Sequence, residues 1–157
     1  MSPQDAFHEL VAALCRELGL QFTPEAGQES FFLEIDGDVL LSVALRPRGA
    51  MAVAAAECEI VRPLNPAATF ERMLTSNAVA AVLGQPTVGL ADGGRKLRAT
   101  LAEPLASLDG ASLTAAIGDL VNVVCAWRDQ IASGTDGSPA PPNDLELDWS
   151  QPGILRG

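Results

Sequence analysis

Two apolar runs flank the tripeptide Asp36-Gly37-Asp38, and this pattern predicts a β-hairpin. Each run has large apolar residues at adjacent positions, Phe31-Phe32-Leu33 and Val39-Leu40-Leu41, so both faces of the hairpin receive apolar side chains. The length of the loop decides which side chains share a face of the sheet. A two-residue loop would scatter polar side chains over both faces, whereas a three-residue loop collects the large apolar side chains on one face. We therefore predict a three-residue loop and a continuous core face. The residues of this face are Phe31, Leu33, Ile35, Val39, Leu41, Val43 and Leu45.

The outer face of the same hairpin is mixed, because Phe32 and Leu40 lie among polar residues. A third strand at about residues 51–61 continues the sheet, and Glu57 and Glu59 mark its solvent side. An antiparallel sheet usually leaves one face in water, so an apolar outer face calls for a cover: a helix, a second subunit or a client protein. The large apolar members of the outer face are Phe32, Leu40, Met51 and Val53.

Helix signals precede and follow these strands. Ser2 and Pro3 open a first helix, and Gly19 ends it. The apolar residues of a second helix are spread round its axis, so we expect more than one of its sides to be buried. A last helix carries an uninterrupted apolar stripe that includes Trp127. The expected helices span residues 3–18, 66–83 and 112–132, and a second hairpin pairs residues 87–91 with 95–103.

The helices are not interleaved singly with the strands, which indicates an α+β fold with an antiparallel twisted sheet and the order αβββαββα. A chain of 157 residues has room for one domain. We assign residues 1–132 to this domain and residues 133–157 to a flexible, acidic tail rich in Pro and Gly. The tail also holds apolar residues among acids, which leaves open a short docking segment or a return of the tail to its own domain. These residues are Leu145, Leu147, Trp149, Ile154 and Leu155.

The chain is strongly acidic, with 20 Asp and Glu residues against 10 Lys and Arg residues and a net charge of −10. This charge disfavours nucleic acid and anionic membranes and favours basic or polar protein partners. No run reaches the about 18 apolar residues that span a membrane, and the N-terminus lacks the basic leader of a signal peptide. Three cysteines, far apart in apolar segments, are typical of buried reduced thiols in a cytosolic protein: Cys15, Cys58 and Cys125.

The sequence offers little catalytic chemistry. His8 is the only histidine, and we expect it on the exposed, polar side of the first helix. The GxSxG, HExxH and glycine-rich phosphate motifs are absent. Asp36 and Asp38 lack the remainder of a calcium loop, and the spacing of the cysteines is wrong for a zinc knuckle. We predict no catalytic residue, no metal and no cofactor; an enzyme would need a pocket near His8 or near the 36–38 turn.

Some local sequence features point to a family. Leu83-Gly84 follows the second helix, with Leu74 and Asn77 upstream, and a run from Leu101 to Asp109 leads into the last helix. Together with the acidity, the chain length, the element order and the final amphipathic helix, these features make the chain similar to one family. Over about residues 3–132 it resembles the class I chaperones of bacterial type III secretion.

The resemblance implies a non-enzymatic homodimer in the bacterial cytoplasm, without nucleotide or other cofactor. It implies that the dimer binds the N-terminal segment of a secreted effector in extended form and keeps it soluble and secretion-competent. The alternative is a non-enzymatic regulatory or adaptor module that has a similar fold and binds other proteins. The implied effector-binding residues are Phe32, Leu40, Ala44, Met51 and Val53, and the implied dimer-interface residues are Leu74, Val79 and Val82.

Overall fold

The first hairpin forms with the three-residue loop that the sequence predicts. β1 (Ser30–Ile35) and β2 (Val39–Arg46) pair in antiparallel fashion, with the last residue of β1 opposite the first residue of β2. Asp36 and Gly37 have φ angles of 52° and 77°. This left-handed backbone geometry reverses the chain tightly and suits glycine and aspartate. The side-chain facing of β1 and β2 follows from this loop.

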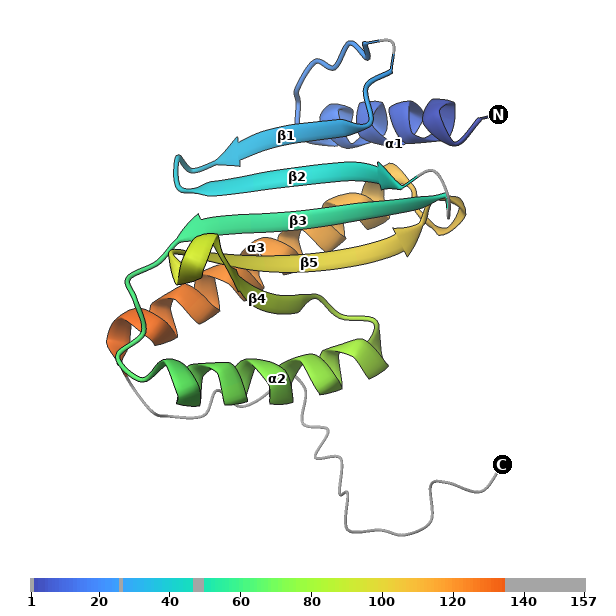
Figure 1. The fold of residues 1–157 in the computed structure, drawn as a ribbon. Helices are drawn as coiled ribbons and strands as arrows, with labels where there is room; N and C mark the ends of the chain where they lie inside the picture. Colours follow the sequence, from blue (N-terminus) through green and yellow to red (C-terminus); the bar gives the residue numbers. More distant parts are fainter. Residues whose placement is uncertain (1, 26, 47–49, 135–157) are drawn as a thin grey trace, which may run out of the picture.

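The structure, a computed structural model, describes residues 2–25, 27–46 and 50–134. In these residues the predicted order αβββαββα is confirmed (Figure 1), with two short 3₁₀ turns added. The further elements are α1 (Pro3–Glu17), β3 (Met51–Glu59), α2 (Pro66–Leu83), β4 (Thr87–Ala91), η2 (Asp92–Gly94), β5 (Lys96–Pro104), η3 (Leu105–Ser107) and α3 (Gly110–Ser133).

The sheet is antiparallel throughout, with the strand order β1-β2-β3-β5-β4. α3 crosses behind the sheet and packs on β3 and β5, while α1 packs against α3 and β2. α2 lies beside β4, at one edge of the sheet, and leaves the front face uncovered in the single chain (Figure 1). The fold therefore has one covered sheet face and one open sheet face.

The covered face is the one that the loop argument assigns to the core. Val39, Leu41, Val43 and Leu45 are buried, and the core residues of β1 are half-buried because β1 is an edge strand. Small side chains on β3 leave room for α3, whose stripe is buried as predicted. The buried residues of this stripe are Leu113, Ile117, Leu120, Val124, Trp127 and Ile131.

By length and composition alone, α3 is apolar enough to cross a membrane. In the fold its buried stripe packs against α1, β3 and β5. The core-facing stripe therefore accounts for part of the hydropathy of α3.

α2 buries less surface than its sequence suggests. Its buried residues are Met73 and Ala80. The expectation that more than one side of this helix is buried is wrong for the single chain, because α2 flanks the sheet edge and does not lie across a face. Phe70, Leu74 and Val82 are left 49%, 71% and 69% exposed. This side of α2 is an apolar surface without a cover in the single chain.

The last helix ends at Ser133 and is capped by Gly134, which has a φ of 60°. The helix is thus slightly longer at both ends than the predicted range of 112–132. The rest of the expected tail, residues 135–157, lies outside the described residues.

Candidate functional site

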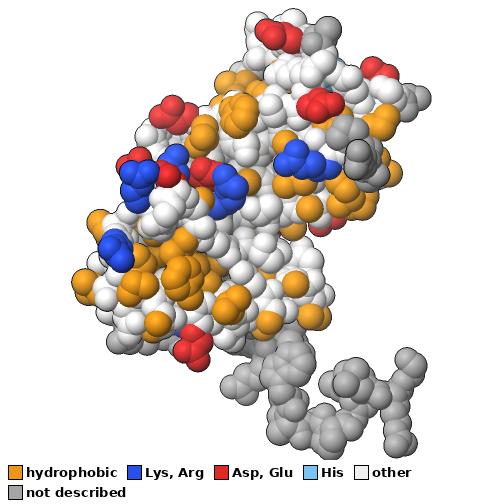
Figure 2. Space-filling view, in the orientation of Figure 1, with side chains coloured by type: hydrophobic (Ala, Val, Ile, Leu, Met, Phe, Trp, Pro, Cys, Tyr) orange, Lys and Arg blue, Asp and Glu red, His pale blue; other side chains and the backbone are white. Residues whose placement is uncertain are grey.

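The outer face of the sheet gathers all five predicted effector-binding residues. Phe32 on β1 and Leu40 on β2 are 61% and 43% exposed, while Ala44, Met51 and Val53 are half-buried. All five point away from α1 and α3, since each alternates with a core residue on its strand. Figure 2 shows hydrophobic side chains in patches on this face, separated by charged side chains. We call these five residues the outer apolar face.

The strand register divides the outer apolar face into two parts. Phe32 and Leu40 are diagonal neighbours, because Phe32 pairs with Ser42 and Leu40 pairs with Glu34. At the other end of β2, Ala44 pairs with Val53. The register thus produces one exposed part and one flatter, half-buried part.

Three further residues of this surface were missed by the sequence reasoning. Ala102 and Pro104 on β5 pair with Val53 and Met51, so they extend the flatter part across a third strand. Ala55 lies between the two parts and is 8% exposed. The register between β3 and β5 places these residues, and no short sequence signal gives that register.

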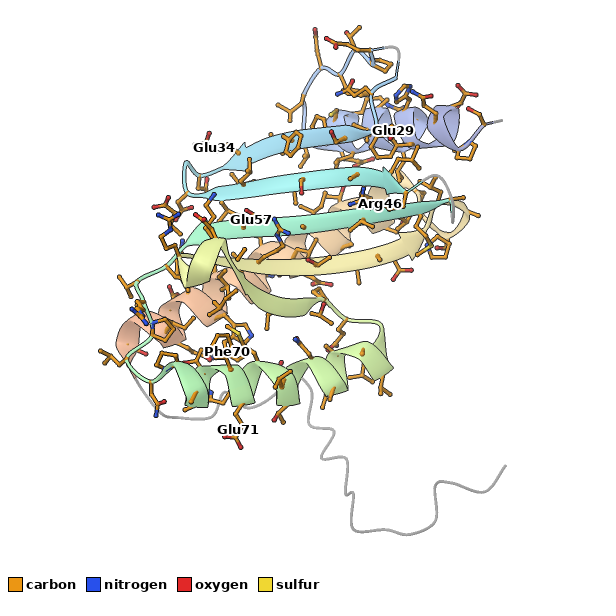
Figure 3. All side chains as sticks on the ribbon, in the orientation of Figure 1. Glu29, Glu34, Arg46, Glu57, Phe70 and Glu71 are labelled. Atoms are coloured by element: carbon orange, nitrogen blue, oxygen red, sulfur yellow. The ribbon has the colours of Figure 1, made fainter. Side chains whose placement is uncertain are left out.

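Charged side chains border the outer apolar face. Glu34, Arg46 and Glu57 project from the sheet on this side (Figure 3). Glu57 forms an ion pair with Arg98, its cross-strand partner on β5, and Glu59 is opposite Lys96. A polar rim around an apolar centre is the usual layout of a protein-binding surface.

The free edge of β1 borders the exposed part of this surface. The backbone N–H of Leu45 donates to the carbonyl of Glu29 at 2.8 Å, so Glu29 is a hydrogen-bonded partner of β2. Because such pairs alternate along an antiparallel ladder, the backbone groups of Phe32 and Glu34 point away from β2. No described residue bonds to them. The edge can therefore accept another strand next to Phe32.

His8 packs against the segment between α1 and β1. It is half-buried, contrary to the expected exposure, because its Nε2 lies 2.9 Å from the carbonyl oxygen of Gln28. Its ring also contacts Phe22, which packs edge-on against Phe31. These contacts hold the segment between α1 and β1 against the start of the sheet. Within residues 2–25, 27–46 and 50–134, no group of three or more His, Cys, Asp or Glu side chains is arranged to hold a metal ion.

The three cysteines are free thiols. Cys15 and Cys58 are buried, and burial raises the pKa of each thiol. A raised pKa keeps a thiol protonated and a poor nucleophile at neutral pH. Cys15 and Cys58 are therefore packing residues of the core.

The predicted dimer-interface residues lie on α2. Leu74 and Val82 are 71% and 69% exposed, whereas Val79 is half-buried. Phe70 points from α2 toward the sheet, and Glu71 points away from it (Figure 3). Phe70, Leu74 and Val82 supply most of the exposed large apolar surface of this helix.

One side chain fastens α2 to the sheet edge. The Asn77 amide accepts a hydrogen bond from the backbone N–H of Val88 at 2.8 Å and donates one to its carbonyl at 2.7 Å. The amide thereby occupies the place of a neighbouring strand on β4. Asn77 is half-buried, because its side chain lies between α2 and β4.

Solved structures share this fold. A chain of the ExsC–ExsE complex has a TM-score of 0.69 and 16% sequence identity, with 83% of the present chain and 97% of that chain covered. A chain of the HopA1–SchA chaperone–effector complex has a TM-score of 0.66 and 15% identity, with 79% and 94% covered.

A chain of a Yersinia pestis structure also matches, that of the type III secretion chaperone SycH with a fragment of YscM2. It has a TM-score of 0.62 and 19% identity, with 77% of the present chain and 98% of that chain covered. No curated protein matches the sequence. The sequence model of the Tir chaperone protein (CesT) family matches residues 9–128, which is most of the domain. The chain therefore belongs to the Tir chaperone protein (CesT) family.

Proposed function

We propose that the protein is a cytosolic type III secretion chaperone without catalytic activity. It binds the N-terminal segment of an effector in extended form and keeps that segment soluble and secretion-competent. The observation that carries the proposal is the outer apolar face beside the free β1 edge, in a chain that belongs to the CesT family. Chaperone–effector complexes among the similar structures support it.

The outer apolar face and the free edge of β1 make different contributions to client binding. Main-chain hydrogen bonds at the edge of β1 accept a strand of almost any sequence, while apolar side chains choose among client side chains. An unfolded client buries a large area but loses about 2–5 kcal/mol or more to ordering, which keeps the complex reversible. The net charge of −10 keeps the free chaperone soluble.

A client-binding test follows from the exposure of Phe32 and Leu40. Phe32→Asp or Leu40→Asp should abolish co-purification of an N-terminal effector fragment encoded near the chaperone gene. Each substitution places a charge where the client would bury apolar surface, and a buried unpaired charge is strongly unfavourable. The circular dichroism spectrum should stay that of the wild type, because both positions are exposed in the free protein.

The matched control is Val61→Asp, at an apolar residue that is 63% exposed but lies outside the sheet. This variant should bind the fragment as well as the wild type does. Full binding by both Phe32→Asp and Leu40→Asp would contradict the proposed client surface.

We also propose that α2 forms a homodimer interface through Leu74, Val79 and Val82. Leu74→Asp should convert the dimer to a monomer in size-exclusion chromatography with light scattering, since Leu74 is 71% exposed and its apolar surface lacks a cover. Thr75→Asp adds the same charge at the next, also exposed position and should leave the dimer intact. A wild-type chain that stays monomeric at high concentration would refute the interface.

A further inference from the structure

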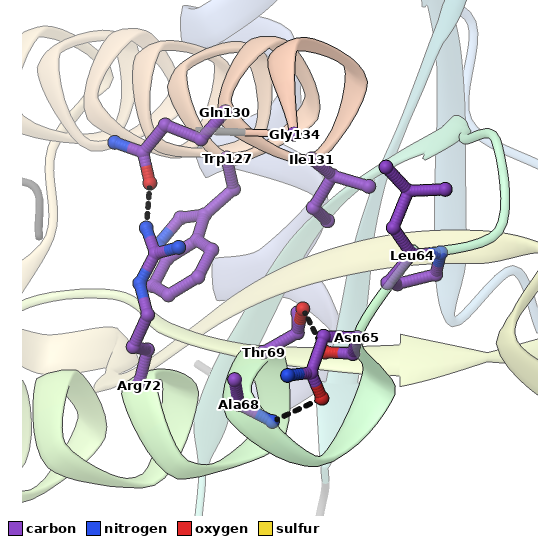
Figure 4. A pocket seen from close by; sticks show the side chains of 10 residues that line it. Leu64, Asn65, Ala68, Thr69, Arg72, Trp127, Gln130, Ile131 and Gly134 are labelled. Carbon is purple, nitrogen blue, oxygen red and sulfur yellow. Dashed lines mark hydrogen bonds between the residues drawn. The ribbon is translucent and has the colours of Figure 1, made fainter. Parts of the chain in front are cut away.

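A small cavity lies between the N-terminal half of α2 and the C-terminal end of α3 (Figure 4). Its volume is about 200 Å³, which is below the about 300–1,000 Å³ of typical sites for small molecules. A cavity of this size suits one or two side chains of a protein segment. The lining residues that define its chemistry are Leu64, Arg72, Trp127, Ile131 and Gly134.

Arg72 gives the cavity its charge. The guanidinium carbon lies 5.5 Å from the centre of the Trp127 ring, and Nη2 donates to Gln130 Oε1 at 2.7 Å (Figure 4). Arg72 Nε is buried and has no hydrogen-bond partner among the described residues. No carboxylate in that part of the chain forms an ion pair with Arg72. A half-buried cation without a counter-charge favours an anionic ligand, and a carboxylate forms the strongest hydrogen bonds with guanidinium.

The other wall of the cavity is apolar and open. Ile131 lies on α3, and Leu64 beside it is 89% exposed. Gly134, which caps α3, also lines the cavity: a Cβ atom on it would lie 3.2 Å from Leu64 Cδ1. The C-terminal segment of the chain therefore starts at the mouth of the cavity.

The C-terminal segment contains side chains of the matching chemistry. Asp144, Glu146 and Asp148 alternate with Leu145, Leu147 and Trp149. In an extended conformation this alternation places the carboxylates on one side and the apolar groups on the other. The linker 135–143 spans about 30 Å when extended, since each residue adds about 3.3 Å. Such a linker can bring Asp144 and the residues after it back to the cavity.

We propose that the segment Asp144–Trp149 docks on this cavity of its own chain. A carboxylate of the segment pairs with the Arg72 guanidinium and supplies its missing acceptor. The alternate apolar side chains cover Leu64 and Ile131. The position of Gly134, the charge of Arg72 and the alternation of the segment favour this occupant over a separate protein.

The test is a measurement of backbone order by ¹⁵N NMR relaxation on the full-length chain without a client. The amides of residues 144–149 should have order parameters near about 0.85, as in rigid backbone, and Arg72→Gln should lower them below about 0.6. Asp144→Asn, Glu146→Gln and Asp148→Asn combined should do the same, and this variant changes no residue of the described domain. A rise in salt should weaken the docking, because the ion pair is partly screened.

The matched control is Arg16→Gln, at an exposed arginine of α1, which should leave residues 144–149 ordered. The proposal is overturned if these amides are mobile in the wild-type chain at low salt, or if both charge variants leave them ordered. Ordering that appears only after addition of an effector fragment, or only with rising chain concentration, assigns the segment to that partner and also overturns the proposal.

Discussion

Replacement of Leu41 by alanine should lower the free energy of unfolding by about 2–5 kcal/mol, whereas replacement of Leu40 should change it by about 0.5 kcal/mol or less. Leu41 is fully buried on the core face of β2, and its neighbour Leu40 is 43% exposed on the outer face. Truncation of Leu41 removes a full set of apolar contacts and leaves a cavity, whereas truncation of Leu40 removes fewer contacts and leaves no enclosed cavity. The two variants have the same chemistry at adjacent positions, so their difference reports the facing of the sheet.

Urea denaturation followed by circular dichroism measures both values. The chain concentration is held fixed, because the proposed dimerisation would make the stability depend on concentration. Equal losses in Leu40→Ala and Leu41→Ala would mean that both faces of the sheet are covered. A larger loss in Leu40→Ala would reverse the faces and would contradict the three-residue loop at Asp36-Gly37-Asp38.

The facing of the first hairpin could be predicted because it depends on local information. Loop length and the alternation of side chains fix which residues share a face. The same logic placed Met51 and Val53 on the outer face, since Glu57 and Glu59 mark the solvent side of β3. Local capping signals likewise predicted the starts of α1 and α2: Asn65, for example, accepts a hydrogen bond from the Ala68 N–H at 3.2 Å. The start of α3 was predicted two residues late, because its N-cap is Asp109.

Contacts between segments far apart in the sequence could not be predicted from such local signals. Gly110 is an example: a Cβ atom there would lie 2.8 Å from the Ala13 Cβ atom, so glycine permits the close approach of α1 and α3. The sequence around Gly110 indicates only a helix start. The ion pair of Asp38 with Arg128, at 2.5 Å, ties the hairpin loop to α3 across 90 residues. Such pairings depend on tertiary packing, for which a single sequence has no periodic signal.

The burial of α2 is a second feature that the sequence pattern did not predict. Its scattered apolar residues predict burial on several sides, and the single chain buries only Met73 and Ala80. Periodicity reports that a surface is apolar but does not report what covers it. We propose that a second copy of the chain covers the remaining apolar surface of α2 in a homodimer.

The attachment of α2 makes Asn77 the second position of large expected effect. Asn77→Ala should lower the free energy of unfolding by about 1–3 kcal/mol, because it leaves the N–H and the carbonyl of Val88 without their partner. The loss is expected to fall on α2 in particular, since this helix has few buried residues to hold it. Hydrogen exchange of the α2 amides should therefore accelerate more than exchange in α3.

A matched control is Asn122→Ala, which removes an exposed asparagine from α3 and should change the stability by about 0.5 kcal/mol or less. If α2 presents the dimer interface, Asn77→Ala should also weaken dimerisation, because the exposed apolar side chains are then held less firmly in register. Weakened dimerisation with unchanged hydrogen exchange in α2 would separate the two effects and refute the anchoring role. A larger acceleration of exchange in α2 than in the sheet and α3 would identify the Asn77–Val88 pair as the anchor of the helix.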